Sequence, residues 1–255
     1  MGSNIEDMDQ RATAFIESLA SNSVGTDLED KWYCIAACAF TACNEPKYVA
    51  TIFTVATKDH QSDLNHQTLV LRRIKESLLK TSIIYGIPRL INAFRALVRL
   101  VPSPSLWEQP SPSSPTSVSS STRLAVSVPS TLDPRALSYM RTIFRSDLDP
   151  FLGVMDSYWP DLRTLVVTTI YGYYQSDLSI LGAVETSMLN IASLMPMDVA
   201  EEVGWHLRGL VRNGGTESQA RETVGLVRGV MEVTGVVLRN EMPLVEEVVG
   251  EERLF

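Results

Sequence analysis

The chain has few of the residues from which disulfide frameworks and metal sites are built. Its 255 residues include three cysteines and three histidines. The cysteines, Cys34, Cys38 and Cys43, share one apolar segment, CIAACAFTAC, and their spacing matches neither a C-x-x-C pair nor a zinc site. An odd, clustered set of cysteines does not make a disulfide framework. We therefore expect small buried core cysteines, no metal site and no cofactor.

Long hydrophobic runs and basic clusters are missing as well. No apolar run approaches the roughly 20 residues that span a bilayer. The opening MGSNIEDMDQ is acidic and polar, unlike a secretory or transit peptide. With 22 basic and 30 acidic residues, the net charge of −8 offers no attraction to nucleic acid or to an anionic membrane. We expect a soluble, cytoplasmic protein without nucleic-acid or membrane partners.

Hydrophobic residues are plentiful, at 45% of the chain, and can build a large core. They recur at three- and four-residue steps in segments such as TDLEDKWYCIAACAFTAC, LSILGAVETSMLNIASL and DVAEEVGWHLRGLVRN, which is the period of amphipathic helices. Pro196 and the pair Gly214-Gly215 mark helix ends, and Thr216 with Gln219 has capping-box spacing. Strand-like alternation is absent. The pattern predicts an all-α fold.

Residues 102–134 interrupt this pattern. The segment is rich in Pro and Ser and nearly free of charge, so we expect an irregular linker or long loop. It separates residues 1–101 from residues 135–255, two helical halves of similar size. Sliding the chain on itself by about 149 residues aligns Arg72 with Arg221 and Gly86 with Gly235. We expect a tandem pair of divergent repeats, with a coincidence of helix lengths as the alternative.

One histidine, His206, lies in a clearly patterned place, eight residues before Gly214. Glu185 lies eleven positions before Pro196 and His206 ten positions after it. In an antiparallel helical hairpin these two positions reach the same height, so we expect the side chains to meet. A carboxylate there would raise the pKa of the imidazole and fix its tautomer for proton transfer. The alternative is a packed histidine without chemistry.

Further side chains are candidates for a substrate pocket beside this pair. Tyrosines in such places mostly pack, an arginine on an amphipathic helix mostly faces solvent, and a lysine in an apolar run mostly snorkels toward water. These roles remain the alternatives to substrate binding. The candidate residues are Trp205, Tyr171, Tyr174, Arg208, Lys80 and Tyr85.

The stretch ETSMLNIASLMPMDVAEEVGWHLRGLVRNGGTESQARE resembles the motif region of the carboxymuconolactone decarboxylase and alkylhydroperoxidase-D-like superfamily. In that motif a glutamate precedes a histidine across a helical hairpin, and a glycine follows eight residues later. LRRIKESLLKTSIIYGIPRLINAF in the first half is similar to the closing helix of the family. The resemblance covers most of both halves and is closest to divergent tandem fungal members. It implies an AhpD-like helical bundle and a homo-oligomer.

The resemblance also bears on activity. The peroxidase branch carries C-x-x-C before the matching histidine, whereas this chain reads EEVGWH there, which argues against thiol peroxidase chemistry. The decarboxylase branch lacks those cysteines. The resemblance therefore implies a cofactor-free lyase or isomerase of a small carbonyl, lactone or polyketide-type compound, with His206 as proton donor and Glu185 orienting it. The alternative is a non-catalytic helical interaction protein. An open, partly apolar pocket bordered by both residues would favour the enzyme.

Overall fold

The computed structural model describes residues 2–101, 106–107 and 129–252, and within these ranges the fold is all-α without a strand, as predicted. None of the helices in the described part of the chain is long and apolar enough to cross a membrane. The helices before the linker are α1 (Gly2–Asn22), α2 (Trp32–Ala42), α3 (Tyr48–Ala56), α4 (Leu64–Tyr85) and α5 (Ile87–Leu100). The helices after it are α6 (Pro129–Phe144), α7 (Leu148–Tyr158), α8 (Pro160–Thr164), the π-helix η4 (Leu165–Gln175), α9 (Ala183–Leu194), α10 (Ala200–Arg212), α11 (Glu217–Thr234) and α12 (Val245–Glu252).

The ends of α4 and α11 follow local rules. The predicted capping box at α11 is present: the Gln219 amide N–H donates to the Thr216 hydroxyl oxygen, and the Thr216 N–H donates to the Gln219 side chain. Gly86 ends α4 and Gly235 ends α11, with φ of 87° and 72°. These values favour glycine, because a Cβ strains the backbone there.

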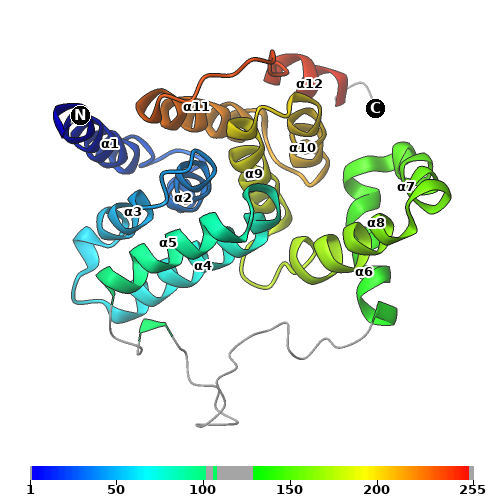
Figure 1. Ribbon diagram of the computed structural model, residues 1–255, viewed down its shortest axis with the longest axis horizontal. Coiled ribbons are helices and arrows are strands. Elements are labelled where there is room, and N and C mark those ends of the chain that lie inside the picture. Colours follow the sequence, from blue (N-terminus) through cyan, green and yellow to red (C-terminus); the bar gives the residue numbers. More distant parts are fainter. Residues whose placement is uncertain (1, 102–105, 108–128, 253–255) are drawn as a thin grey trace, which may run out of the picture.

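The main core lies around α2 and α9. Every residue of α2 is buried, and α9 runs beside it through the middle of the molecule (Figure 1). Each of these helices also packs on a helix from the other side of the linker: α2 contacts α11, and α9 contacts α4. The core is therefore shared between the two halves. This reciprocal packing fits a duplication, which stays a prediction.

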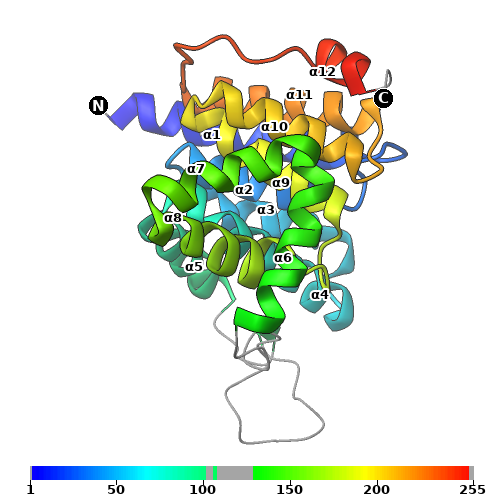
Figure 2. The ribbon, with the colours of Figure 1, turned by 90° about the vertical axis from the view of Figure 1, so that its right-hand side faces the viewer.

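A second, smaller core joins α6, α7 and η4. Figure 2 shows α6, α7 and α8 in front of the main core. Trp205 of α10 packs against this group from the main body. The core residues of this group are Ala136, Tyr139, Met140, Ile143, Phe144, Leu148, Leu152, Val167 and Tyr171.

The helix α6 begins at Pro129, inside the segment expected to be irregular up to residue 134. Leu132 explains the difference, because its side chain is fully buried. The Arg135 guanidinium then ties the helix to η4 by donating to the Ser176 hydroxyl oxygen at 3.0 Å. Tertiary packing thus outweighs the unfavourable Pro/Ser composition. The rest of the predicted linker, apart from residues 106–107, lies outside the described residues.

Candidate functional site

His206 lies in the middle of α10, which forms an antiparallel hairpin with α9. Its ring nitrogen Nδ1 is 3.3 Å from the side-chain nitrogen Nδ2 of Asn190 on α9. Asn190 is fully enclosed and His206 partly so. The imidazole therefore has a partner across the hairpin, as the sequence predicts, but that partner is an amide.

The predicted contact between Glu185 and His206 is wrong. The Glu185 carboxylate accepts a hydrogen bond from the Gly182 N–H at 2.8 Å and forms an ion pair with Arg73 of α4. It closes the first turn of α9 and links that turn to the other half of the chain. Glu185 therefore does not orient the imidazole directly.

The connection between α9 and α10 explains the shift. Met195–Met197 form a short 3-10 turn, and Asp198 has a left-handed backbone with φ of 62°. The middle of the hairpin thus lies near Asp198 and not at Pro196. Asn190 and His206 are each eight positions from Asp198, so these two residues come to the same height.

Asn190 belongs to a chain of buried polar groups. Its Nδ2 donates to Oε1 of Gln175 at 2.9 Å, and Gln175 Nε2 donates to Asn190 Oδ1 at 3.3 Å. Gln175 Nε2 also donates to the backbone carbonyl of Lys80 at 3.0 Å. We call Lys80, Gln175, Asn190 and His206 the buried polar row. Its members come from α4, η4, α9 and α10.

Lys80 does not snorkel toward water, because its side chain is fully buried. Its ammonium group donates to the backbone carbonyls of Tyr174 and Gln175 at 3.0 and 2.9 Å. These carbonyls are at the end of η4, where helical carbonyls lack partners within the helix and carry partial negative charge. The expectation of snorkelling is therefore wrong, and the lysine instead closes the end of a helix.

Burial lowers the pKa of His206 to about 4, below its ordinary value of 6.5. Removing an imidazolium from water costs free energy, and the carboxylate that was expected to offset this cost pairs with Arg73 instead. The ring is therefore neutral at neutral pH. The expectation that His206 has a raised pKa and acts as an imidazolium is wrong.

Aromatic rings lie next to His206 along α10. The Trp205 ring is 5.3 Å from Phe144, and Phe144 is 6.0 Å from Tyr171, measured between ring centroids. The hydroxyl of Tyr139, whose ring is 6.2 Å from that of Tyr171, is buried and has no hydrogen-bond partner among the described residues. The structure thus brings Trp205 and Tyr171 together in one aromatic group.

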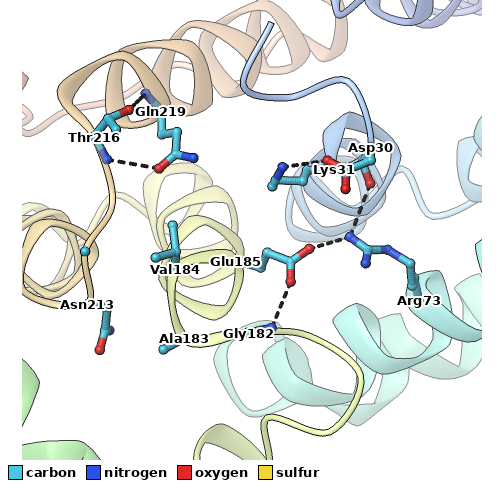
Figure 3. Close-up of a pocket in the computed structure, with 11 residues that line it drawn as sticks. Asp30, Lys31, Arg73, Gly182, Ala183, Val184, Glu185, Asn213, Thr216 and Gln219 are labelled. Atoms are coloured by element: carbon cyan, nitrogen blue, oxygen red, sulfur yellow. Dashed lines mark hydrogen bonds and ion pairs between the residues drawn. The ribbon is translucent and has the colours of Figure 1, made fainter.

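A cleft of about 380 Å³ opens at the amino-terminal end of α9 (Figure 3). Arg73 and Glu185 form its central ion pair, and the Arg73 guanidinium also donates to the backbone carbonyl of Asp30 at 3.2 Å. Lys31 lies beside Asp30 at the start of α2. The wall draws on both halves of the chain. His206 is not one of the residues that line this cleft, so Glu185 and His206 do not border one shared pocket here, and the observation expected to favour the enzyme is not met at this cleft.

The other candidate residues make contacts within the protein. The Tyr85 hydroxyl donates to the Leu78 carbonyl at 2.8 Å. The Tyr174 carbonyl is a partner of Lys80. Arg208 forms an ion pair with Glu251 at 2.9 Å, in which both side chains are partly exposed.

The cysteines behave as core residues. Cys34 and Cys38 are buried, and Cys43 is partly buried. Burial raises the pKa of Cys38 and of Cys43 to about 11, so neither is a thiolate at neutral pH. In the described ranges, no group of three or more His, Cys, Asp or Glu side chains is placed to hold a metal ion.

The sequence patterns did not point to three residues of these sites: Asn190, Gln175 and Arg73. Asn190 had a signal, because it shares one face of the otherwise apolar LSILGAVETSMLNIASL helix with Thr186, Ser187 and Ser193, and a buried amide demands a partner. No feature of the sequence singles out Gln175 or Arg73. Their roles depend on contacts with residues 15 and 112 positions away in the chain.

No family model matches the chain, and no solved structure matches it. The chain is similar to Peroxisomal protein 2 of Saccharomyces cerevisiae, with 26% identity over 249 residues, covering 80% of this chain and 87% of that protein. It is also similar to Peroxisomal protein 2 of Schizosaccharomyces pombe, with 23% identity over 212 residues, covering 82% of this chain and 90% of that protein.

Both relatives have a peroxisomal name, which contradicts the cytoplasmic localisation expected from the sequence. That expectation rested on an opening segment unlike a secretory or transit peptide. A comparison with secretory and transit peptides does not test for other organelles.

Proposed function

We propose that this protein is a cofactor-free lyase or isomerase that acts on a small carbonyl, lactone or polyketide-type compound in association with peroxisomes. The names of the two relatives support the location. The observation that carries the chemistry is the buried polar row, which ends at the imidazole of His206.

A packed histidine needs a single hydrogen-bond partner. The partner of His206, Asn190, is itself held by further buried hydrogen bonds. Buried polar side chains cost free energy unless every donor and acceptor is matched. Here the backbone carbonyl of Lys80 and the side chains of Gln175 and Asn190 are matched in series up to Nδ1 of the His206 ring. Nδ1 is thereby used, and in this proposal Nε2 is the nitrogen that meets the ligand. In this proposal the neighbouring ring of Trp205, which packs on Phe144, forms the apolar side of the site.

A neutral imidazole can assist chemistry next to a carbonyl group. When solvent water takes a proton from that position, or carbon dioxide leaves it, the electron pair of the broken bond moves into an enolate, and a hydrogen-bond donor at the enolate oxygen lowers the barrier. In this proposal His206 is the catalytic residue at the oxygen. Glu185 is a positioning residue, because its contacts with Gly182 and Arg73 fix the start of the helix that carries Asn190.

We also propose that the chain is a divergent tandem member of the carboxymuconolactone decarboxylase and alkylhydroperoxidase-D-like superfamily. Three observations support this proposal. His206 is on the second helix of a helical hairpin, and Gly214 follows eight residues later with φ of 91°. The two halves pack reciprocally through α2 with α11 and α9 with α4.

Hydrogen exchange in heavy water tests the activity without knowledge of the product. An enzyme that stabilises an enolate replaces C–H by C–D next to a carbonyl group, which proton NMR detects as a loss of signal. The probes are α-angelica lactone, triacetic acid lactone and cyclohexenone. We expect the protein to accelerate exchange in at least one probe and His206→Gln to reduce that rate by about 100-fold or more.

The matched control is His66→Gln. His66 stacks on His60 at 4.0 Å between ring centroids, away from the buried polar row, so its replacement is expected to leave exchange unchanged. Exchange at the buffer rate with every probe would contradict the catalytic proposal and favour the non-catalytic helical interaction protein.

A further inference from the structure

Each hydrogen bond of the buried polar row has one possible donor and one possible acceptor. The assignment begins at the backbone carbonyl of Lys80. The carbonyl of Lys80 can only accept hydrogen bonds, so the side-chain atom of Gln175 that lies 3.0 Å from it must be the nitrogen. A reversed amide would bring two acceptor oxygens into contact. The side-chain oxygen of Gln175 is therefore the atom that faces Asn190.

The same reasoning fixes Asn190. Because Oε1 of Gln175 only accepts, the Asn190 atom at 2.9 Å must be Nδ2. This orientation also places Oδ1 of Asn190 3.3 Å from the Gln175 nitrogen, which has a second hydrogen to donate. The remaining hydrogen of Asn190 Nδ2 is left for Nδ1 of His206 at 3.3 Å.

We infer that Asn190 and Gln175 are positioning residues that hold His206 in the neutral tautomer with its proton on Nε2. Nδ1 must accept from Asn190, and a neutral imidazole carries its single proton on the other nitrogen. An imidazolium would set two donors, Nδ1–H and Nδ2–H, against each other. The row therefore selects both the charge and the tautomer of the ring.

This tautomer determines which kind of ligand atom His206 can bind. With Nε2 protonated, His206 offers an N–H donor, which suits a carbonyl or enolate oxygen and not a proton to be abstracted or a metal ion. The choice of a carbonyl ligand rests on the proposed function. The tautomer itself rests only on the hydrogen bonds of Lys80, Gln175 and Asn190.

Long-range proton–nitrogen NMR correlation of the ¹⁵N-labelled full chain at pH 7 reads the tautomer directly. The chain has three histidines, and the His206 ring is identified by its absence from the spectrum of His206→Gln. We expect Nε2 to show the shift of a protonated ring nitrogen and Nδ1 that of an unprotonated one. A protonated Nδ1 in the unaltered protein would overturn the inference.

Two variants test the residues that set the tautomer. Asn190→Asp places an acceptor against Nδ1 and is expected to move the proton onto it. Gln175→Leu frees the Asn190 amide to turn, so both tautomers are expected to be populated, and it serves as the test if Asn190→Asp does not fold.

The matched control is Ser193→Ala, on the same helix, because the Ser193 hydroxyl is buried without a partner among the described residues. It is expected to leave the tautomer unchanged. An unaltered tautomer in every folded Asn190 or Gln175 variant would overturn the roles of these two residues.

The readout separates this inference from the proposed function. A ring protonated on Nε2 together with no hydrogen exchange in any probe would support the positioning roles and contradict the catalytic proposal. Exchange activity that His206→Gln abolishes, with Nδ1 protonated in the unaltered protein, would support a catalytic His206 but would overturn both the inferred tautomer and the role of Nε2–H as the donor.

Discussion

At the scale of single residues, the surroundings of His206 depress its pKa and thereby link stability to pH. The folded protein holds the ring with a pKa of about 4, against an ordinary value of 6.5. Between these values the unfolded chain binds a proton that the folded chain does not. Stability from this group is therefore complete above pH 6.5 and is lost as the pH falls toward 4.

This linkage predicts a difference between the protein and His206→Gln. Urea unfolding at several pH values between 7.5 and 4 is expected to show a larger loss of unfolding free energy in the unaltered protein, by up to about 3 kcal/mol. Asp9 and Glu252 have lowered pKa values, from hydrogen bonds with Lys47 and Arg212 respectively. The stability lost when these carboxylates are protonated in acid is the same in both proteins. Equal pH slopes in the two proteins would show that His206 titrates normally in the fold.

The residue scale also shows where inference from sequence ended. The pattern around His206 correctly indicated a partner across a helical hairpin. The partner was misplaced because the 3-10 turn and left-handed Asp198 shift the hairpin by a few positions, and local patterns predict turn geometry poorly. Gln175 could not be found, since its role depends on the distant backbone carbonyl of Lys80.

At the scale of elements, α1 packs against α11 through a close contact at a glycine. A Cβ added to Gly229 would lie 2.4 Å from a ring carbon of Phe15, so Gly229→Ala forces the ring or the whole helix α1 to move. The higher helix propensity of alanine offsets part of this cost, so we expect a net loss of about 0.5 to 2 kcal/mol in unfolding free energy, measured by chemical denaturation.

Gly225 supplies the matched control, one turn earlier in the same helix. A Cβ there meets nothing within 4 Å, so Gly225→Ala is expected to stabilise the protein by about 0.5 to 1 kcal/mol through higher helix propensity. Stabilisation by both substitutions would mean that α1 does not pack on α11 as described.

Helical period and capping predicted the fold class and the start of α11, because these signals are local. The start of α6 was missed for the opposite reason. Pro134 inside the helix argues against it locally, yet the side chain of Leu132 is buried in the protein and this packing stabilises the helix. The π-helical form of η4 likewise had no sequence signal. It matters to the site, because its last residue is Gln175.

At the scale of the whole molecule, the two halves depend on each other. Arg73 on α4 and Glu185 on α9 pair across them, with side chains 14% and 18% exposed, and the main core draws residues from both. The repeat inferred from aligned glycines therefore does not imply two independent units. Alignment of a sequence with itself suggests equivalent helices but does not reveal which of them pack together.

One face of the molecule exposes a row of large apolar side chains on α5. Ile87, Ile91, Phe94 and Val98 are 53%, 42%, 50% and 38% exposed. They follow one another at steps of four, three and four, the spacing with which helices pack side by side. We propose that a second copy of this chain covers this face, because homo-oligomers commonly pair equivalent surfaces about a two-fold axis and the resemblance noted above implies a homo-oligomer.

Light scattering after size exclusion, over a series of protein concentrations, tests this assembly. The single chain has a mass of 28.2 kDa, and we expect a multiple of this value for the unaltered protein. Ile91→Glu places a charge in the centre of the apolar row and is expected to lower the mass to that of one chain, since burying an unpaired carboxylate costs more than the contact stabilises.

Val154→Glu is the control, because Val154 is 60% exposed on α7, away from this row, and is expected to leave the mass unchanged. A single-chain mass for the unaltered protein at every concentration would contradict the oligomer, and an undiminished mass in Ile91→Glu would move the interface to another face.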